Sequence, residues 1–307
     1  MQGWRRSNED AHINAMNFEP DLHLFAVFDG HGGCEVAKYC KKYYIDLLRA
    51  EPAFAAKDYE SALRNSFLKI DRDLISEKGK KELVKIAREN GNDVTDGTEL
   101  SKQCGCTANV CLVTPTHIYV ANTGDARCVV SENKKAIDLS VDHKPDLPSE
   151  RSRVYAAGHT VEDSRVDGII AISRALGDWE YKNERLDADK MAVSGHPEIR
   201  VHPIGPNTEF FICACDGIWD CMTSQVAVDF VHESIPKVVG FSKKNDKSPP
   251  ARKSSVANKE KALNASIEAS KFKGLATVVE MMMDFNCPTN LAQSDGLGTD
   301  NMTCIIV

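Results

Sequence analysis

The chain has 307 residues, of which 42% are hydrophobic and 27% are charged, enough apolar material for one large domain or two ordinary ones. Its formal net charge of −7 argues against nucleic acid binding, because a phosphate backbone requires a basic surface. No apolar run is long enough to cross a bilayer, so we expect no membrane span.

The cysteines predict a reducing environment. There are eleven, an odd number, and none forms a C-x-x-C pair. This pattern is typical of buried free thiols rather than of disulfides or a zinc site. The first residues, 1–6, run directly into polar sequence without the apolar stretch of a secretory leader. We therefore expect a cytoplasmic or nuclear protein.

The predicted elements begin with a buried strand at 22–28, which is followed by a glycine-rich turn at 30–33. Apolar residues at helical spacing then predict helices at about 34–48 and 58–75. Residues 78–103 are polar and charged, and we expect either a surface helix or a loose insertion there.

The middle of the chain has the pattern of short strands. Three strands joined by turn residues in 107–130 predict an antiparallel meander. A short helix at 149–157 ends at Gly158, and the sequence 166–170 is typical of a hairpin. Another strand is expected at 209–215, before a helix that Thr223 or Ser224 can cap.

Towards its end the chain changes composition. Residues 236–272 are rich in Lys, Ser and Asn without apolar periodicity, which favours a flexible insertion. A helix near 275–282 and a last strand after the glycine-rich loop 290–298 follow. Strand runs with helices in pairs between them predict an α+β fold, in which sheets pack face to face and are covered by helices.

Three carboxylates stand at the edges of strongly apolar runs. Asp29 and Asp216 follow such runs, and Asp300 precedes one. A carboxylate at the mouth of a buried strand is costly unless a cation or strong donors compensate it. Three similar sites far apart in the chain suggest one shared divalent metal cluster. Because the available ligands are oxygens, the cluster favours Mg²⁺ or Mn²⁺ over zinc.

Six motifs occur along the chain, namely Gly3-Trp4-Arg5 with Glu9-Asp10, Asp29-Gly30-His31-Gly32-Gly33, Gly124-Asp125-Ala126-Arg127, Ser173-Arg174-Ala175-Leu176-Gly177-Asp178, Asp216-Gly217-Ile218-Trp219-Asp220 and Asp300-Asn301-Met302-Thr303. In type and order they resemble those of the metal-dependent Ser/Thr protein phosphatases of type 2C. The resemblance covers nearly the whole chain. It implies a single catalytic domain, 1–307, with a central antiparallel β-sandwich flanked on both sides by pairs of helices and polar insertions at about 78–103 and 236–272.

The resemblance also implies a two-metal phosphohydrolase that uses Mg²⁺ or Mn²⁺. Asp29 would bridge the two ions, and the Gly30 carbonyl would complete one of them. Glu9 would bind one ion, and Asp216 with Asp300 would bind the other. The water that bridges the ions would become the nucleophile as hydroxide, so no covalent intermediate is needed.

The remaining site residues follow from the same resemblance. His31 would be the general acid that protonates the departing oxygen, and Arg5 would hold the phosphate. Asp10 is expected to orient metal-bound water rather than to bind metal directly. Asp125 and Asp220 resemble the ligands of a third, weaker metal.

Each assignment has a structural alternative, in which the acidic residues only end strands or cap helices. We interpret the motif that ends in Asp178 as structural, with Arg174 as a buried ion-pair partner. Two other functions compete: a pseudophosphatase that binds without catalysis, and a two-metal hydrolase of small phosphoesters or nucleic acid. We expect a monomer that acts on phosphoprotein substrates.

Overall fold

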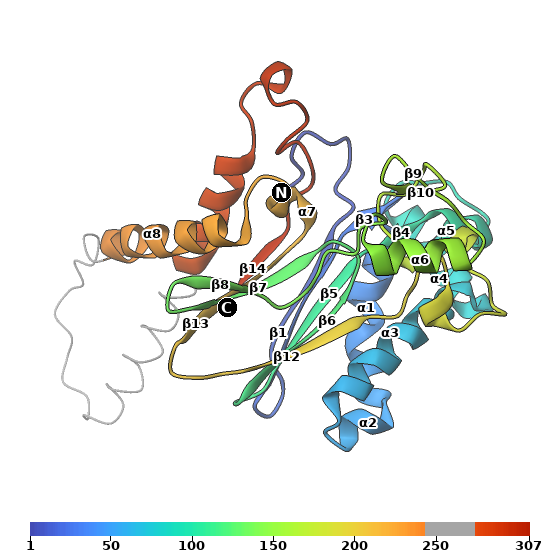
Figure 1. Ribbon diagram of the computed structural model, residues 1–307, viewed down its shortest axis with the longest axis horizontal. Helices are drawn as coiled ribbons and strands as arrows, with labels where there is room; N and C mark the ends of the chain where they lie inside the picture. The colour runs from blue at the N-terminus through green and yellow to red at the C-terminus, as the bar shows by residue number, and fades with distance from the viewer. Residues whose placement is uncertain (243–273) are drawn as a thin grey trace.

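The computed structural model of the protein describes residues 1–242 and 274–307. Two antiparallel sheets pack face to face in its centre (Figure 1). The five-stranded sheet has the order β1 (Ala11–Glu19), β2 (Leu22–Phe28), β5 (Ala108–Val113), β6 (His117–Thr123) and β12 (Glu198–Pro203). The four-stranded sheet has the order β14 (Cys304–Ile306), β13 (Thr208–Ala214), β7 (Arg127–Glu132) and β8 (Lys135–Asp138).

Side-chain alternation along β2 explains the layers. Phe25 and Val27 point into the core between the sheets, where they meet Phe211 of the opposite sheet. Leu24 and Phe28 point the other way, into the core beneath the helices. Successive residues of a strand face opposite sides. A strand that is buried on both faces therefore reads as the nearly continuous apolar run seen in the sequence.

Helices cover both outer faces of the sandwich (Figure 1). On the five-stranded sheet lie α1 (Glu35–Ala50) and α3 (Tyr59–Ile75), joined by the short α2 (Pro52–Ala55). On the four-stranded sheet lie α8 (Ser224–Ser242) and a helix over residues 274–286, next to the single turn α7 (Asp216–Trp219). The predicted α+β sandwich with paired helices is confirmed.

Two smaller sheets and several short helices complete the described fold. One three-stranded sheet has the order β11 (Leu176–Gly177), β4 (Gly105–Cys106) and β3 (Gly30–His31). The strands β9 (Val161–Glu162) and β10 (Arg165–Val166) form a hairpin beside α6 (Pro148–Ala156). Single 3-10 turns lie at η1 (Trp179–Tyr181), η2 (Ala188–Lys190) and η3 (Leu291–Gln293).

The predicted meander is only partly right. Strands β5 and β6 pair over their whole length, but β7 leaves their sheet and pairs with β13 and β8. The neighbour of β6 on its other edge is β12, which the sequence analysis did not predict. The Gly124-Asp125 turn therefore carries the chain from one sheet to the other. Three strands with turn signals between them do not show which strands pair.

The structure distinguishes the alternatives for the first predicted insertion and moves the start of the second. Residues 78–103 follow the helical alternative, because they form most of α4 (Glu77–Glu89) and all of α5 (Gly97–Gln103), and α4 buries Leu83 and Ile86 in the core. The predicted start of the second insertion, at 236, is wrong, because α8 continues through Pro236 to Ser242. The rest of that insertion lies outside the described residues. Within the described residues no helix is long and apolar enough to cross a membrane.

Candidate active site

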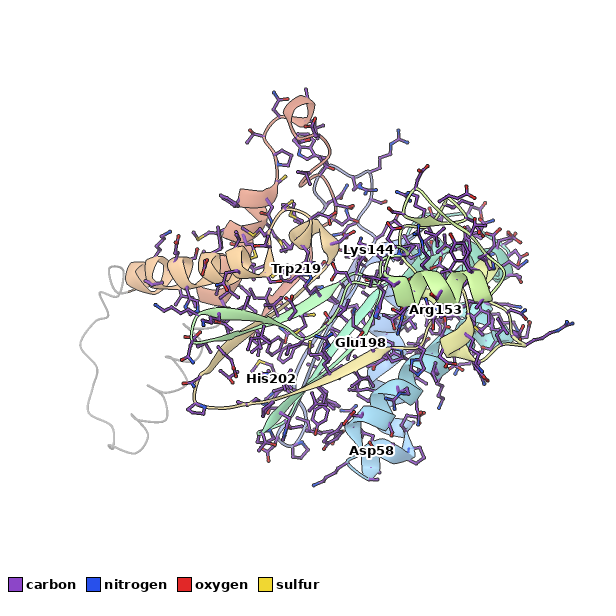
Figure 2. All side chains as sticks on the ribbon, viewed as in Figure 1. Asp58, Lys144, Arg153, Glu198, His202 and Trp219 are labelled. Carbon is purple, nitrogen blue, oxygen red and sulfur yellow. The ribbon has the colours of Figure 1, made fainter. Side chains whose placement is uncertain are left out.

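A cavity of about 960 Å³ opens at one end of the sandwich. Strands β2, β6 and β13 end there, and β1, β7 and β14 start there, so residues just outside six strands converge. Figure 2 marks Lys144 and Trp219 in this region. Nine of the ten residues predicted for the site line the cavity: Arg5, Glu9, Asp29, Gly30, His31, Asp125, Asp216, Asp220 and Asp300.

The carboxylates in the cavity repel one another. Burial, followed by the charges of Asp216 and Asp10, raises the pKa of Asp29 well above its ordinary value. Burial and the charges of Asp125 and Asp220 raise the pKa of Asp216 to about 7. Desolvation and like charges both disfavour the ionised form, and a bound cation reverses both effects. The cluster therefore has the donor set and the unmet charge of a divalent cation site.

Asp10, the tenth predicted residue, lies just behind the cavity. One of its carboxylate oxygens accepts a hydrogen bond from the Thr303 hydroxyl at 2.7 Å. Its other oxygen, Oδ1, is buried and has no hydrogen-bond partner. A buried acceptor without a partner is rare and points to a missing ion or water. This observation fits the prediction that Asp10 orients metal-bound water.

A thiol also approaches these carboxylates. Asp10, Asp29 and Cys215 offer oxygen and sulfur atoms within 4.8 Å of one another. Burial raises the pKa of the Cys215 thiol well above its ordinary value, so this sulfur stays protonated. A neutral thiol is a poor metal ligand. The hard oxygen ligands preferred by Mg²⁺ and Mn²⁺ therefore remain the relevant set.

Asn301 fixes the segment that carries Glu9. Its side-chain oxygen accepts from the Glu9 backbone N–H at 2.8 Å, and its amide nitrogen donates to the carbonyls of Gln2 and Ser7 at 2.8 and 3.0 Å. The Glu9 carboxylate accepts from the Gly33 N–H at 3.2 Å. One buried amide thus connects residues 2–9 to the strand end next to Asp300.

Arg5 contacts a predicted metal ligand. Its guanidinium lies 2.5 Å from Oδ2 of Asp300, and both side chains are exposed to the cavity. The positive charge of Arg5 therefore offsets part of the negative charge of the carboxylates in the cavity. The same fork of donors suits a phosphate group once a cation neutralises Asp300.

Lys144 is a site residue that the sequence analysis missed. It lines the cavity and forms an ion pair with Asp125, one of the predicted third-metal ligands. The neighbouring His143 holds this arrangement, because its Nδ1 accepts from the Gly124 N–H at 3.2 Å and its own N–H donates to the Gly124 carbonyl at 3.0 Å.

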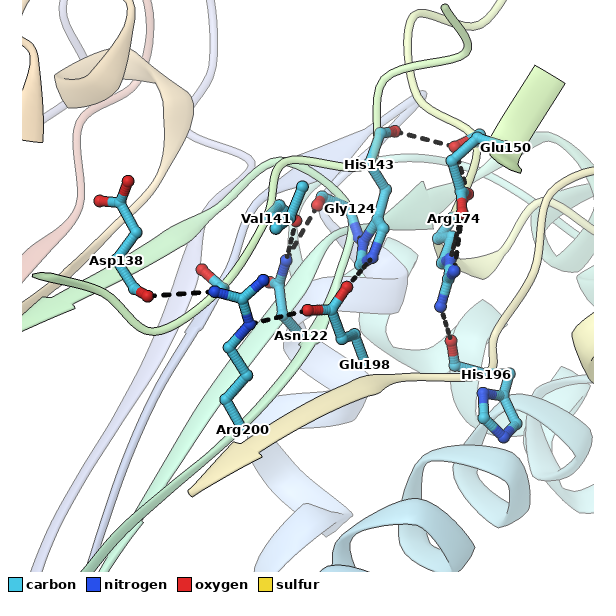
Figure 3. A network of polar contacts seen from close by, with 12 residues as sticks. Asn122, Gly124, Asp138, Val141, His143, Glu150, Arg174, His196, Glu198 and Arg200 are labelled. Carbon is cyan, nitrogen blue, oxygen red and sulfur yellow. Dashed lines mark hydrogen bonds and ion pairs between the residues drawn. The ribbon is translucent and has the colours of Figure 1, made fainter. Parts of the chain in front are cut away.

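Figure 3 shows the polar network behind this loop. His143 faces Glu198 at 3.6 Å, and Glu198 also accepts from Arg200 at 2.8 Å. The His143 carbonyl accepts from the Ser173 backbone N–H at 3.0 Å, and the Ser173 hydroxyl donates to Glu150 at 2.7 Å. The loop that carries Lys144 is therefore held by two carboxylates on different elements, the buried Glu150 and the partly exposed Glu198.

His31 has a carboxylate partner that the sequence did not reveal. Its Nε2 lies 2.8 Å from Oδ2 of Asp178, which is only 2% exposed. Burial lowers the pKa of His31, but the charge and hydrogen bond of Asp178 outweigh this and raise it. The motif that ends in Asp178 was interpreted mainly as structural, and this contact with His31 was not predicted.

The three-stranded sheet explains how the pair forms. It places Gly30–His31 on one side of Gly105–Cys106 and Leu176–Gly177 on the other, so Asp178 follows directly behind His31. A Cβ atom at Gly105 would collide with the side chains of both Asp178 and His31. Only glycine therefore leaves room for the contact.

The hairpin β9–β10 forms part of the rim. Arg165 and residues 169–172 line the cavity, and Ile169 is 65% exposed. The predicted turn at Asp167-Gly168 is confirmed, because both residues have positive φ and Val166 bridges to Ile170. The sequence predicted this turn but gave no sign that it lies beside the acidic cluster.

The prediction about the supporting residue Arg174 holds. Arg174 forms the expected buried ion pair, with Glu150 at 2.7 Å. Trp219, within the motif that starts at Asp216, donates from Nε1 to the Ala214 carbonyl at 2.7 Å.

Comparisons with known proteins agree with this geometry. The family model described as Protein phosphatase 2C matches residues 1–258. A "Probable protein phosphatase 2C 5" of Paramecium tetraurelia is 41% identical over 310 residues, covering 100% of this chain and 90% of that protein. A "Protein phosphatase 2C homolog 2" of Schizosaccharomyces pombe is 36% identical, covering 100% of this chain and 70% of that protein. A crystal structure of a phosphatase from Toxoplasma gondii superposes with a TM-score of 0.63 at 21% identity, covering 100% of this chain and 89% of that one.

The fold and the acidic cavity define a metal-dependent serine/threonine protein phosphatase. The family match and the length of the aligned relatives show that the chain belongs to the protein phosphatase 2C family.

Proposed function

We propose that this protein hydrolyses phosphoserine and phosphothreonine in phosphoproteins with two Mg²⁺ or Mn²⁺ ions held by Glu9, Asp29, the Gly30 carbonyl, Asp216 and Asp300. One observation carries the proposal: these residues converge from distant parts of the chain on a single cavity. Their mutual repulsion and the unpartnered oxygen of Asp10 support a cation among them.

The ions, when bound, supply a nucleophilic water at neutral pH and stabilise the charge of the phosphoryl oxygens. The chain's own side chains position the substrate around them. Arg5 is already at the cavity and exchanges its contact with Asp300 for the phosphate oxygens. This exchange requires that a cation take over the charge of Asp300.

His31 provides the proton for the departing serine or threonine oxygen. Asp178 accepts from its Nε2, which leaves Nδ1 as the donor and stabilises the protonated ring. The raised pKa of His31 favours a role as general acid, because it keeps more of the imidazole protonated near neutral pH. Asp178 does not touch the reacting atoms and acts as a positioning residue.

A third metal at Asp125 and Asp220 is part of the proposal. Both carboxylates line the cavity, but Lys144 already pairs with Asp125. A third ion there competes with this lysine and is therefore expected to bind more weakly than the other two.

The competing functions are less well supported. A pseudophosphatase typically lacks one of the metal carboxylates, whereas Glu9, Asp29, Asp216 and Asp300 all line the cavity. A nuclease is disfavoured by the net charge of −7.

A panel of phosphopeptides and one phosphodiester, each assayed with Mn²⁺, Mg²⁺ and EDTA, tests the proposal. We expect hydrolysis of phosphoserine and phosphothreonine peptides with either ion and none with EDTA. Preferential hydrolysis of the diester would favour the competing two-metal hydrolase, and activity in EDTA would exclude a metal mechanism.

We also propose a cytoplasmic or nuclear location. All eleven cysteines are free, and eight of them are buried. Such thiols persist in reducing compartments. Fractionation with an antibody to the protein tests this location.

A further inference from the structure

A second cavity, of about 630 Å³, lies outside the catalytic site. It is formed by the start of α4, the helix α5 and the loop that follows Asp178, with these lining residues: Ile75, Lys80, Thr98, Ser101, Lys102, Trp179, Lys182, Asn183, Glu184 and Arg185. Four of these ten residues come from the predicted insertion 78–103, and five come from residues 179–185.

The second cavity is basic in an acidic protein. Four of its lining residues are cationic and one, Glu184, is acidic. Lys182 is neutralised by the buried Asp71 at 2.7 Å. Three cations are left at the surface of the cavity, namely Lys80, Lys102 and Arg185.

These three cations are poorly compensated. Within residues 1–242 and 274–307 no ion pair involves Lys102 or Arg185, and Lys80 has a contact of 3.7 Å with Glu77, whose side chain is 86% exposed. Glu184 lines the cavity, and Asp96 lies near it: hydrogen bonds from Thr98 and, more weakly, the charges of Lys80 and Lys102 lower the pKa of Asp96. It is exposed and already occupied by Thr98.

The cavity is preformed. Helix α5 packs tightly on α4, because a Cβ at Gly97 would collide with the carbonyl of Lys80. On the opposite wall, Trp179 donates from Nε1 to the Asp71 carbonyl at 3.0 Å, and Lys182 donates to the Ala175 carbonyl at 2.9 Å. A ligand therefore has little ordering entropy to overcome.

This cavity and the catalytic cavity share a wall. Gln103 and Tyr181 line the catalytic side, while their chain neighbours Lys102 and Lys182 line the other. Between them, Asp178 faces His31 and the next residue, Trp179, faces the second cavity. The basic cavity therefore lies on the other side of the segments that carry these neighbouring residues.

We propose that this basic cavity is an anion subsite that receives a second phosphate group carried by the phosphoprotein substrate. The assignment rests on the proposed phosphatase function. Lys102 and Arg185, which form no ion pair among the described residues, and Lys80, whose only ion pair there is with the exposed Glu77, suit a phosphate dianion, and Thr98 and Asn183 add polar side chains to the lining. Free inorganic phosphate offers the same chemistry, and the experiment separates the two sources.

Direct binding is measured in EDTA by tryptophan fluorescence, since Trp179 lines the cavity and no turnover is needed. The probe is a peptide with one phosphoserine and one non-hydrolysable phosphonate analogue of phosphoserine at varied spacing. We expect a saturable fluorescence change that disappears in Trp179→Phe and in the double variant Lys102→Glu/Arg185→Glu. Equal affinity for inorganic phosphate would overturn the assignment to a substrate-borne phosphate.

Kinetics with Mn²⁺ provide the second test. The double charge reversal is expected to raise KM for the probe peptide about tenfold, with kcat and the hydrolysis of p-nitrophenyl phosphate unchanged. Lys81→Glu is the matched control, because Lys81 is an exposed lysine on α4 that does not line the cavity. An unchanged KM, or an equal rise in the control, would overturn the subsite while leaving the phosphatase intact. Absence of all hydrolysis would contradict the phosphatase instead, and the fluorescence result would still decide the subsite.

Discussion

At the scale of single residues, the contact between His31 and Asp178 predicts that two kinds of substrate depend differently on His31. The carboxylate is almost fully buried, while His31 lines the cavity. Serine alkoxide is a poor leaving group that needs a proton as the P–O bond breaks, whereas p-nitrophenolate hardly needs one.

His31→Ala is therefore expected to slow hydrolysis of a phosphoserine peptide about a hundredfold more than hydrolysis of p-nitrophenyl phosphate. Asp178→Asn should show the same selectivity with a smaller loss, because the ring remains but its orientation and charge are less well held. The ratio of the two kcat/KM values in each variant is the measurement. Equal losses on both substrates would assign His31 to metal-site structure rather than to proton transfer.

The sequence predicted the metal residues well and their partners poorly. Asp29, Asp216 and Asp300 were recognisable because each stands at the edge of an apolar strand. Asp178 is 147 positions from His31, and their contact depends on a three-stranded sheet with strands of two residues. Such short strands have no periodicity that a sequence can reveal.

At the scale of elements, α6 is attached to the domain by a buried ion cluster (Figure 3). Glu150 accepts from Arg174 at 2.7 Å and lies 2.6 Å from Arg153. Burial raises the pKa of Glu150, but hydrogen bonds from Arg174 and the charges of both arginines outweigh this and lower it to about 2.

Glu150→Gln leaves both arginines without their carboxylate, so it should lower the free energy of unfolding by about 3–5 kcal/mol. Because the pKa is lower in the folded state, this contribution is fully present above the ordinary value of 4.5 and is lost as pH falls towards 2. Guanidinium unfolding of both proteins from pH 6 to pH 3 measures the difference. A difference that stays constant across that range would contradict the ionic origin.

Elements were predicted correctly where the apolar pattern is strong. The predicted strand at 22–28 coincides with β2, and the helices at 34–48 and 58–75 correspond to α1 and α3. The strands β1, β8 and β12 were not predicted; few or none of their residues are buried. Edge strands have half of their surface in water and therefore lack a clear apolar run.

At the scale of the whole molecule, the site depends on residues from both ends of the chain. Asn301 holds Glu9, Gln2 and Ser7 together, and the Trp4 N–H donates to the Thr299 carbonyl at 2.9 Å. Glu9 therefore reaches the cavity through contacts with residues almost 300 positions away.

Asn301→Ala removes three hydrogen bonds behind Glu9. We expect the Mn²⁺ concentration for half-maximal activity to rise roughly tenfold, as is typical when residues behind metal ligands are lost. Activity at saturating Mn²⁺ should largely recover. A loss that excess Mn²⁺ does not restore would show that Asn301 acts on catalysis by another route.

The sandwich itself could be predicted from the order of the motifs, but the pairing of strands within its two sheets could not. Strand β7 belongs to the four-stranded sheet because of packing between the two sheets, and the local sequence pattern of β7 does not show this. The same step positions Asp125 at the cavity beside Asp216.

The central claim is that Asp29, Asp216 and Asp300 bind the catalytic metal ions. Asp216→Asn keeps the size of the side chain and removes one charge, so it tests this claim most directly. Hydrolysis of a phosphoserine peptide is measured over a Mn²⁺ titration, together with the melting temperature in EDTA. We predict a loss of several orders of magnitude in kcat/KM at limiting Mn²⁺, with the melting temperature in EDTA unchanged or raised because repulsion among the carboxylates is relieved. Wild-type activity of Asp216→Asn at limiting Mn²⁺ would contradict the assignment.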